Sequence, residues 1–197
     1  GAGNLLGAQQ SGFIVDMGYE TFQKIITEAM EELGVETGMA TKSSASRFVT
    51  DCVIETDQPA MIPDSYIDIT AEKIRIYKQL DSQTSEKETD RLKVQLVDRF
   101  GKMPVEVENL FEVLKIRNYA ASLGFEKVII KDGMLIMFFI SNPMSDYYKS
   151  DIFASVLDKV SSFPALFELK QKENKLKLVS HGVVSLPSAY SYLKKLG

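Results

Sequence analysis

The sequence is poor in the residues that bind metal ions or form disulfides. Its 197 residues include one cysteine (Cys52), one histidine (His181) and no tryptophan. A single cysteine cannot form a disulfide within the chain, and it fits a reducing compartment. One histidine and one cysteine also fall short of the usual zinc ligand sets, although an all-carboxylate magnesium site stays open. We therefore expect the fold to be stabilised by its apolar core alone.

Long apolar runs and an excess of basic charge are lacking as well. No apolar run reaches the roughly 18 residues that a membrane span needs, so we expect a cytoplasmic chain without a membrane partner. The 23 Lys and Arg residues against 27 Asp and Glu residues leave a net charge of -4. Only residues 125–197 are mildly basic, with 10 basic and 7 acidic side chains. That excess is far below what phosphate neutralisation along a nucleic acid requires.

Motifs for nucleotide binding and catalysis are also missing. The sequence has no G-x-x-x-x-G-K-[ST] phosphate loop and no G-x-G-x-x-G after a predicted strand. A nucleophile and base pair could come only from Cys52 and His181, but Cys52 lies in an apolar segment and His181 precedes Gly182 at a predicted turn. Acidic pairs such as Glu106 and Glu108 indicate solvated helix faces. We therefore predict no catalytic, cofactor-binding or metal-binding residue in this chain.

The first 46 residues predict an N-terminal helical lead-in. Residues 1–15 are rich in Gly, Gln and Ser and predict a loop, and a three- to four-residue apolar period predicts a helix over 18–33. The Ser, Thr and Gly of residues 36–46 are typical of a linker. We therefore predict two domains, 1–46 and 47–197.

A helical block is predicted in the first part of the second domain. A strand candidate over 48–56 and an extended arm with two prolines precede it. The apolar spacing then predicts helices over 69–80, 85–100 and 104–123, the first with Ile69, Ile74, Tyr77 and Leu80 as its apolar set. Ser85 with Glu88 forms a capping box, Gly101 is a stop signal, and Pro104 fits a first helical turn.

The remaining residues predict a small antiparallel sheet. Residues 125–131 and 134–140 flank Asp132-Gly133, a strong hairpin signal, and a helix is expected from Asn142-Pro143 to about residue 160. The same order of strand, strand and helix is then repeated, with strands over 165–170 and 175–180 and a helix over 186–196. Two strand-strand-helix units predict an α+β fold with helices on one face of the sheet. The adjacent Phe138 and Phe139 could form a base-stacking platform on an exposed sheet face. Neighbouring strand residues point to opposite faces, however, so we expect at least one of them in the core and favour a packing role.

Two segments carry a resemblance to a known family. GAGNLLGAQQSGFI (1–14) is similar to the segment after the last helicase motif of the bacterial transcription-repair coupling factors (Mfd) and of their relative RecG, where it is part of the translocation motif. PAMIPDSYI (59–67) and, after IYKQL, QLVDRFGKMPVEVENL (95–110) are similar to the C-terminal domain of the family. The resemblance covers essentially the whole chain.

This resemblance implies the C-terminal part of an ATP-dependent DNA translocase. The full-length family uses ATP and magnesium, binds duplex DNA, displaces stalled RNA polymerase and recruits UvrA. Its C-terminal domain docks on the UvrB-like N-terminal module of the same protein, masks the UvrA-binding surface and restrains the motor. The chain itself lacks the helicase motifs, so we expect no enzymatic activity from it alone.

The resemblance also implies roles for six residues. Gln10, Ser11 and Gly12 match the Q-S-G of the translocation-motif loop, while Asp98 and Arg99 match the charged pair of the D-R-F-G motif that contacts the N-terminal module. Gln95 completes this interdomain contact, at a position where the family often has Glu. Two alternatives stay open: a nucleic-acid-binding α+β module that uses its basic C-terminal third, and a stand-alone enzyme with an unrecognised carboxylate site.

Overall fold

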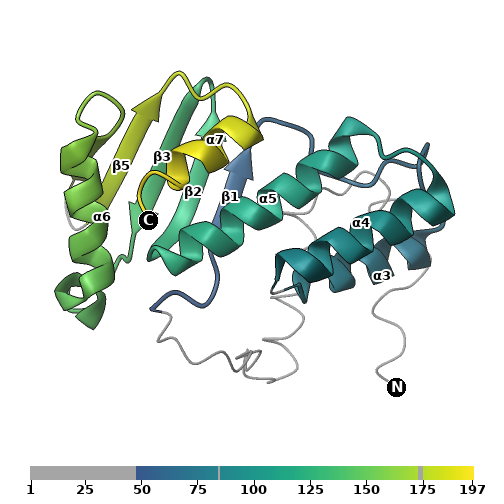
Figure 1. Ribbon diagram of the computed structural model, residues 1–197, viewed down its shortest axis with the longest axis horizontal. Helices are drawn as coiled ribbons and strands as arrows, with labels where there is room; N and C mark the ends of the chain where they lie inside the picture. The colour runs from purple at the N-terminus through teal and green to yellow at the C-terminus, as the bar shows by residue number, and fades with distance from the viewer. Residues whose placement is uncertain (1–47, 84, 173–174) are drawn as a thin grey trace. The chain divides into compact units, whose positions relative to one another are not determined.

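The computed structural model describes residues 48–197 except residues 84 and 173–174 (Figure 1). The predicted lead-in, its linker and the proposed boundary at residue 46 lie outside these residues. The chain divides into two compact units, of which residues 59–111 are the described part of the first. Residues 48–58 and 112–197 are the described part of the second. Each unit is described by itself below.

The first unit is built from helices, as the sequence predicts. These are α3 (Thr70–Asp81), α4 (Glu86–Phe100) and the beginning of α5 (Val105–Ser122). The hydroxyl oxygen of Ser85 accepts a hydrogen bond from the backbone N–H of Glu88 at 3.4 Å and so caps α4. At the other end, Gly101 has a φ of 83°, a left-handed conformation that favours glycine and ends the helix.

The core of the first unit differs from the prediction at α3. Ile69 is 62% exposed and is the N-cap residue, with an extended backbone that takes it off the helical period. The buried stripe of α3 runs instead through Lys73, Ile76, Tyr77 and Leu80. Apolar side chains of α4, α5 and the arm complete the core: Ile62, Ile67, Leu92, Leu96, Val107, Leu110 and Phe111.

The second unit contains a five-stranded sheet (Figure 1). Its strands are β1 (Val53–Thr56), β2 (Phe125–Lys131), β3 (Met134–Phe139), β4 (Glu168–Lys172) and β5 (Lys175–His181), in the order β1-β2-β3-β5-β4. The α+β class is confirmed, but the sheet is mixed, because β1 pairs with β2 in parallel. A parallel neighbour needs a long crossover, and the helices between β1 and β2 provide one.

The hairpin of β2 and β3 forms where the sequence predicts it. Asp132 and Gly133 have φ values of 53° and 71° and join Lys131 directly to Met134 across the turn. Positive φ at both central residues is the geometry of a type I′ turn, whose twist matches that of the paired strands. Two residues of local sequence are therefore enough to set this register.

The next helix begins later than predicted. Asn142 caps only a turn, because its side-chain oxygen accepts a hydrogen bond from the N–H of Met144 at 3.0 Å. A short 3-10 helix, η1 (Asp146–Lys149), follows, and α6 (Asp151–Ser162) begins after Ser150. α7 (Leu186–Leu193) then ends three residues before its predicted limit.

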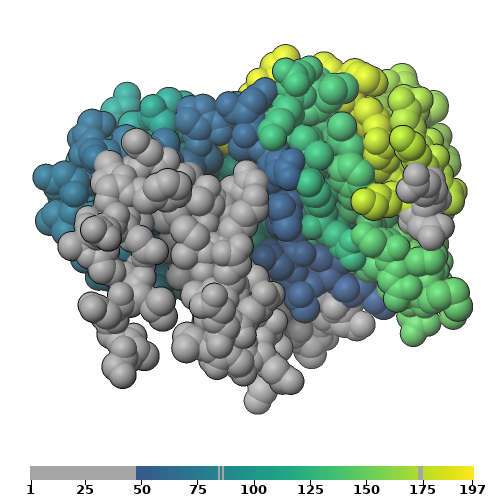
Figure 2. All heavy atoms as spheres, turned by 180° about the vertical axis from the view of Figure 1, so that it is seen from behind, coloured from purple at the N-terminus to yellow at the C-terminus, as the bar shows by residue number. Residues whose placement is uncertain are grey.

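The two faces of the sheet differ. Phe139 is buried and its ring lies 5.5 Å from that of Phe153 on α6, whereas the neighbouring Phe138 is half-buried on the opposite face. This confirms that one of the two phenylalanines belongs to the core. In Figure 1, α5, α6 and α7 lie in front of the strands, and Figure 2 shows strand residues at the surface from behind. None of the helices within the described ranges is long and apolar enough to cross a membrane.

The single cysteine gives a direct test of this packing. Cys52 is completely buried next to β1, and burial, together with the nearby charge of Asp51, raises the pKa of its thiol to about 12. Since the thiolate is the reactive form, we expect a thiol reagent at pH 8 to leave the native chain unlabelled and to label one site in urea. Rapid labelling of the native chain would contradict the buried position.

Candidate interdomain contact surface

The three predicted contact residues lie together at the C-terminal end of α4. Gln95, Asp98 and Arg99 are exposed. On an α-helix, residues three and four positions apart are neighbours, so Gln95 shares a face with both charged residues. The structure therefore brings together the polar set that the D-R-F-G motif indicated.

Arg99 is already held in place within the first unit. Its Nη1 lies 2.7 Å from Oε1 of Glu72 on α3, and its guanidinium carbon lies 4.8 Å from the ring centroid of Phe100. The same carboxylate accepts a hydrogen bond from Arg75 at 2.6 Å. The bond from Arg75 is the main cause of a lowered pKa of Glu72, and that from Arg99 adds to it. Arg99 is thus positioned by its neighbours.

Asp98 differs from Arg99 in its surroundings. It is exposed, and within the part of the chain that the structure describes it makes no ion pair. Two apolar side chains of α4 are exposed beside it: Val94 is 68% and Val97 is 45% exposed. Apolar side chains flanked by charged ones fit an interface with an apolar centre and a polar rim.

Tyr66 joins residues 59–67 to residues 95–110, the two parts of the segment that resembles the C-terminal domain of the family. Its hydroxyl group lies 3.2 Å from the carbonyl oxygen of Leu96 and 3.1 Å from that of Gly101, and it donates to them. Its ring centroid lies 5.9 Å from that of Phe100, and burial raises the pKa of its phenol. The P-D-S-Y segment therefore supports the end of α4. The sequence reasoning missed Tyr66, although an aromatic residue in an otherwise polar turn was a signal.

The arm before α3 is attached to that helix by two further contacts. The backbone N–H of Ile62 donates to the hydroxyl oxygen of Tyr77 at 2.9 Å, and burial raises the pKa of Tyr77 to about 12. Asp64 forms an ion pair with Lys73, whose side chain is only 2% exposed. The sequence predicts only an extended arm, and these two contacts hold that arm against α3.

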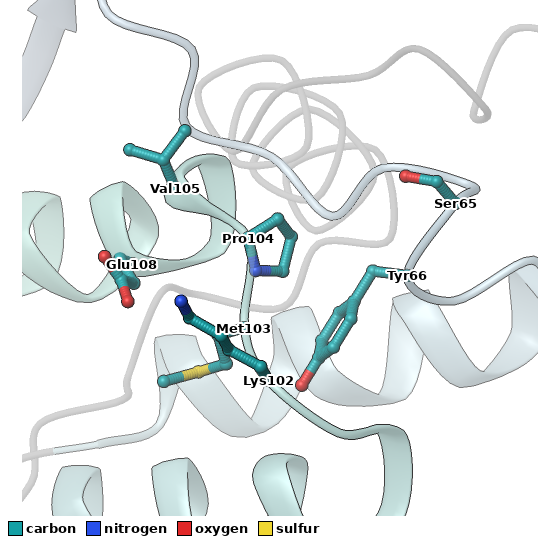
Figure 3. A pocket seen from close by; sticks show the side chains of 7 residues that line it. All are labelled: Ser65, Tyr66, Lys102, Met103, Pro104, Val105 and Glu108. Atoms are coloured by element: carbon teal, nitrogen blue, oxygen red, sulfur yellow. The ribbon is translucent and has the colours of Figure 1, made fainter.

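A hollow of about 460 Å³ lies next to the C-terminal end of α4 (Figure 3). It is lined by Ser65, Tyr66, Lys102, Met103, Pro104, Val105 and Glu108. Figure 3 shows Tyr66 facing the Lys102–Pro104 turn, with Glu108 on α5 at the other side. The Lys102 ammonium in this hollow can donate hydrogen bonds to a partner, the Glu108 carboxylate can accept them, and the hydroxyl groups of Ser65 and Tyr66 can do either. These groups make no nucleophile and base pair. In the described ranges, no group of three or more His, Cys, Asp or Glu side chains could hold a metal ion.

The other residues named from the sequence lie elsewhere. Gln10, Ser11 and Gly12 are outside the described residues. His181 is the exposed last residue of β5, and not a turn residue as predicted, because it still pairs with Met134. Cys52 precedes β1, and β2 and β3 lie between β1 and β5. The structure therefore does not bring Cys52 and His181 together.

Comparison with known proteins matches this chain to a family model and to curated relatives. Residues 56–150 match the family model described as the TRCF domain. A transcription-repair-coupling factor of Bacillus subtilis (strain 168) is 40% identical over 120 residues, which are 61% of this chain and 10% of that protein. One of Rickettsia typhi is 33% identical over 147 residues, 74% of this chain and 13% of that protein. One of Escherichia coli (strain K12) is 31% identical over 130 residues, 65% of this chain and 11% of that protein.

A solved structure shares the fold. The crystal structure of a C-terminal domain of transcription-repair coupling factor superposes with a TM-score of 0.59 at 21% sequence identity. The match covers 75% of this chain and 93% of that one. The chain spans only 10 to 13% of the three relatives named above.

Proposed function

Since the chain belongs to the transcription-repair coupling factors and corresponds to their C-terminal part, we propose that residues 47–197 are the regulatory domain of such a factor. In this proposal the domain docks on the UvrB-like N-terminal module of the same protein. Docking masks the surface that binds UvrA and restrains the motor. Release of the domain then accompanies engagement of a stalled RNA polymerase.

One observation carries the proposal: the exposed end of α4 combines apolar and charged side chains. Val94 and Val97 are exposed beside Asp98, while Glu72 fixes Arg99 from α3. Arg99 loses little conformational freedom on docking because Glu72 already orders it, and ordering costs about 0.5–1.5 kcal/mol for a mobile side chain. Its guanidinium offers further donors to a partner carboxylate.

A regulatory contact between domains must be weak enough to open when the protein is activated. Interfaces between domains of one chain are polar and moderate in area, and motion across them is common. Charged pairs at the rim of such a contact set the orientation more than the affinity. The pair Asp98 and Arg99 fits this demand better than a large apolar surface would.

The remaining parts of the proposal concern the motor. We assign residues 1–46 to the end of the translocase module, with Gln10, Ser11 and Gly12 in the translocation-motif loop. Hydrolysis of ATP with magnesium, and translocation on duplex DNA, belong to other domains of the full-length factor. The chain contributes restraint and not catalysis.

The test replaces the charged pair in the full-length protein. Asp98→Ala together with Arg99→Ala removes the docking contact, so UvrA binding in a pull-down and basal ATPase activity should both rise. We expect about five-fold or more, the lower end of typical coupling between sites. Unchanged UvrA binding would remove both residues from the contact.

α4 contains its own matched control. Asp90 and Arg91 are the same residue types in the same order, are also exposed, and lie eight residues earlier on the helix. The double substitution Asp90→Ala and Arg91→Ala should leave UvrA binding and ATPase activity at the wild-type level. Glu72→Gln removes the internal partner of Arg99 but keeps the Arg99 guanidinium. It therefore tests the positioning of Arg99 separately from the contact that Arg99 makes with the N-terminal module.

A further inference from the structure

The face of the sheet opposite the helices is an ordered polar and apolar surface. Residues paired across neighbouring strands point to the same side, so the registers give the rows of this face. One row crosses all five strands through Val53, Lys127, Phe138, Lys177 and Lys170. Figure 2 views the molecule from this side, with residues of β2, β3 and β5 at the surface. We call this surface the open face.

The open face is positive although the chain as a whole is negative. Six lysines point to it and two glutamates: Lys127, Lys131, Lys170, Lys172, Lys175 and Lys177, with Glu55 and Glu168. Glu55 pairs with Lys127 at 2.6 Å and with Lys131 at 3.8 Å, and Glu168 pairs with Lys170 at 2.9 Å. The remaining lysines leave an excess of positive charge on one side of a chain whose net charge is -4.

Apolar side chains lie between the lysines. Phe138 is half-buried, and the Nζ of Lys177 lies 5.5 Å from its ring centroid. The next row places the half-buried Ile129 and Ile136 beside it. Neighbouring strands are about 4.8 Å apart, so Lys127 and Lys177 flank Phe138 at one strand spacing on either side. The Phe138 ring can stack a base, and the Lys177 ammonium beside it can neutralise an adjoining phosphate. The Lys127 ammonium is paired with Glu55 on β1.

We propose that the open face binds single-stranded DNA across strands β2, β3 and β5. A duplex would keep its base faces stacked and could not use Phe138. An acidic peptide would satisfy the lysines but would leave the half-buried ring and isoleucines without a planar partner. Selective RNA binding needs an acceptor for the hydrogen bond that the 2′-hydroxyl donates. The two carboxylates among the lysine rows could accept it, but both are already paired with lysines.

This proposal does not depend on the regulatory role. It concerns the second unit, whereas the docking residues lie on α4 in the first. It gives a location to the basic C-terminal third, whose summed charge alone was too small to indicate binding. The pairing register of the strands places the lysines on one face of the sheet, which the total charge does not reveal.

The experiment measures fluorescence anisotropy of a labelled 15-nucleotide oligothymidylate with the 197-residue chain. Binding should weaken as salt rises, with a log–log slope of about -2 to -4 for three to six lysines, since each contributes about -0.7 on a single strand. Oligouridylate, a duplex of the same length and a peptide of alternating Glu and Gly are measured in parallel. Each should bind at least five-fold more weakly.

Variants locate the site. Lys127→Gln, Lys170→Gln and Lys177→Gln combined should weaken binding at least ten-fold in 50 mM salt and make the slope about 2 smaller. The control combines Lys78→Gln, Lys87→Gln and Lys159→Gln, three exposed lysines that lie on helices, and should bind like wild type. Phe138→Leu should weaken binding about five-fold or more without changing the slope, because it removes stacking and no charge.

Several results would overturn the proposal. They are absence of salt-dependent binding up to 200 µM chain (roughly the range of weak non-specific binding), equal loss in the two triple variants, or tighter binding of duplex, RNA or peptide. Wild-type binding by Phe138→Leu would also overturn it. Circular dichroism of each variant checks that the sheet is intact. If Phe138→Leu does not fold, Phe138→Met is tested in its place.

Discussion

Gly124→Ala is expected to destabilise the second unit by more than about 3 kcal/mol. Gly124 follows α5 with a φ of 88°, where alanine is strained. An added β-carbon would also overlap Cε2 and Cζ of Tyr147 and lie 2.7 Å from its Oη. Tyr147 cannot move aside, because it is fully buried, donates to the carbonyl oxygen of Leu123 at 2.7 Å and packs on Phe139 and Phe153.

Gly133→Ala is the matched control. Gly133 also has a positive φ, 71°, but nothing lies within 4 Å of its added β-carbon. We expect a loss of about 1 kcal/mol from backbone strain alone. Urea denaturation followed by circular dichroism measures both variants. Equal losses would show that strain, and not the contact with Tyr147, sets the requirement for glycine at position 124.

The ion pair between Asp64 and Lys73 is expected to give the second large effect. The Lys73 side chain is 2% exposed, whereas that of Asp64 is 49% exposed. Asp64→Ala would leave an ammonium group enclosed without its partner. Breaking a fully buried pair costs about 3–5 kcal/mol, and the exposed carboxylate reduces this to about 2 kcal/mol here. Denaturation of the first unit should follow at lower urea.

Removing the charge as well should restore stability. Lys73→Met keeps a long apolar side chain in the same place, so we expect it to cost less than about 1 kcal/mol. The double variant with Asp64→Ala should then be more stable than Asp64→Ala alone. If the double variant is instead the least stable of the three, the pair itself stabilises the fold, and our assignment of the loss to an unpaired ammonium is wrong.

Local signals predicted most of the elements. The capping residue Ser85, the glycine at 101 and the Asp132-Gly133 turn each act over a few residues, so their effect could be inferred without tertiary structure. Asn142 was misread for the same reason, since a cap residue before a proline also starts a simple turn. Where two local outcomes share one signal, packing decides between them.

The candidate contact surface was predicted only in part. Asp98, Arg99 and Gln95 were identified by resemblance, and the helical period explains why they share a face. The role of Glu72 in holding Arg99 could not be read from the sequence, because residues 72 and 99 belong to different helices. The aromatic Tyr66 in a polar turn was visible in the sequence, but its partners were not, because Leu96 and Gly101 lie 30 and 35 residues away in the chain.

By itself, the sequence determined the succession of helices and strands, the hairpin register and the absence of nucleotide motifs, because these depend on neighbouring residues. Only the tertiary structure decided that β1 joins the sheet in parallel, that Tyr66 supports the end of α4, and that dispersed lysines gather on the open face. These features join residues far apart in the chain, through contacts whose free energy exists only after folding has brought the partners together.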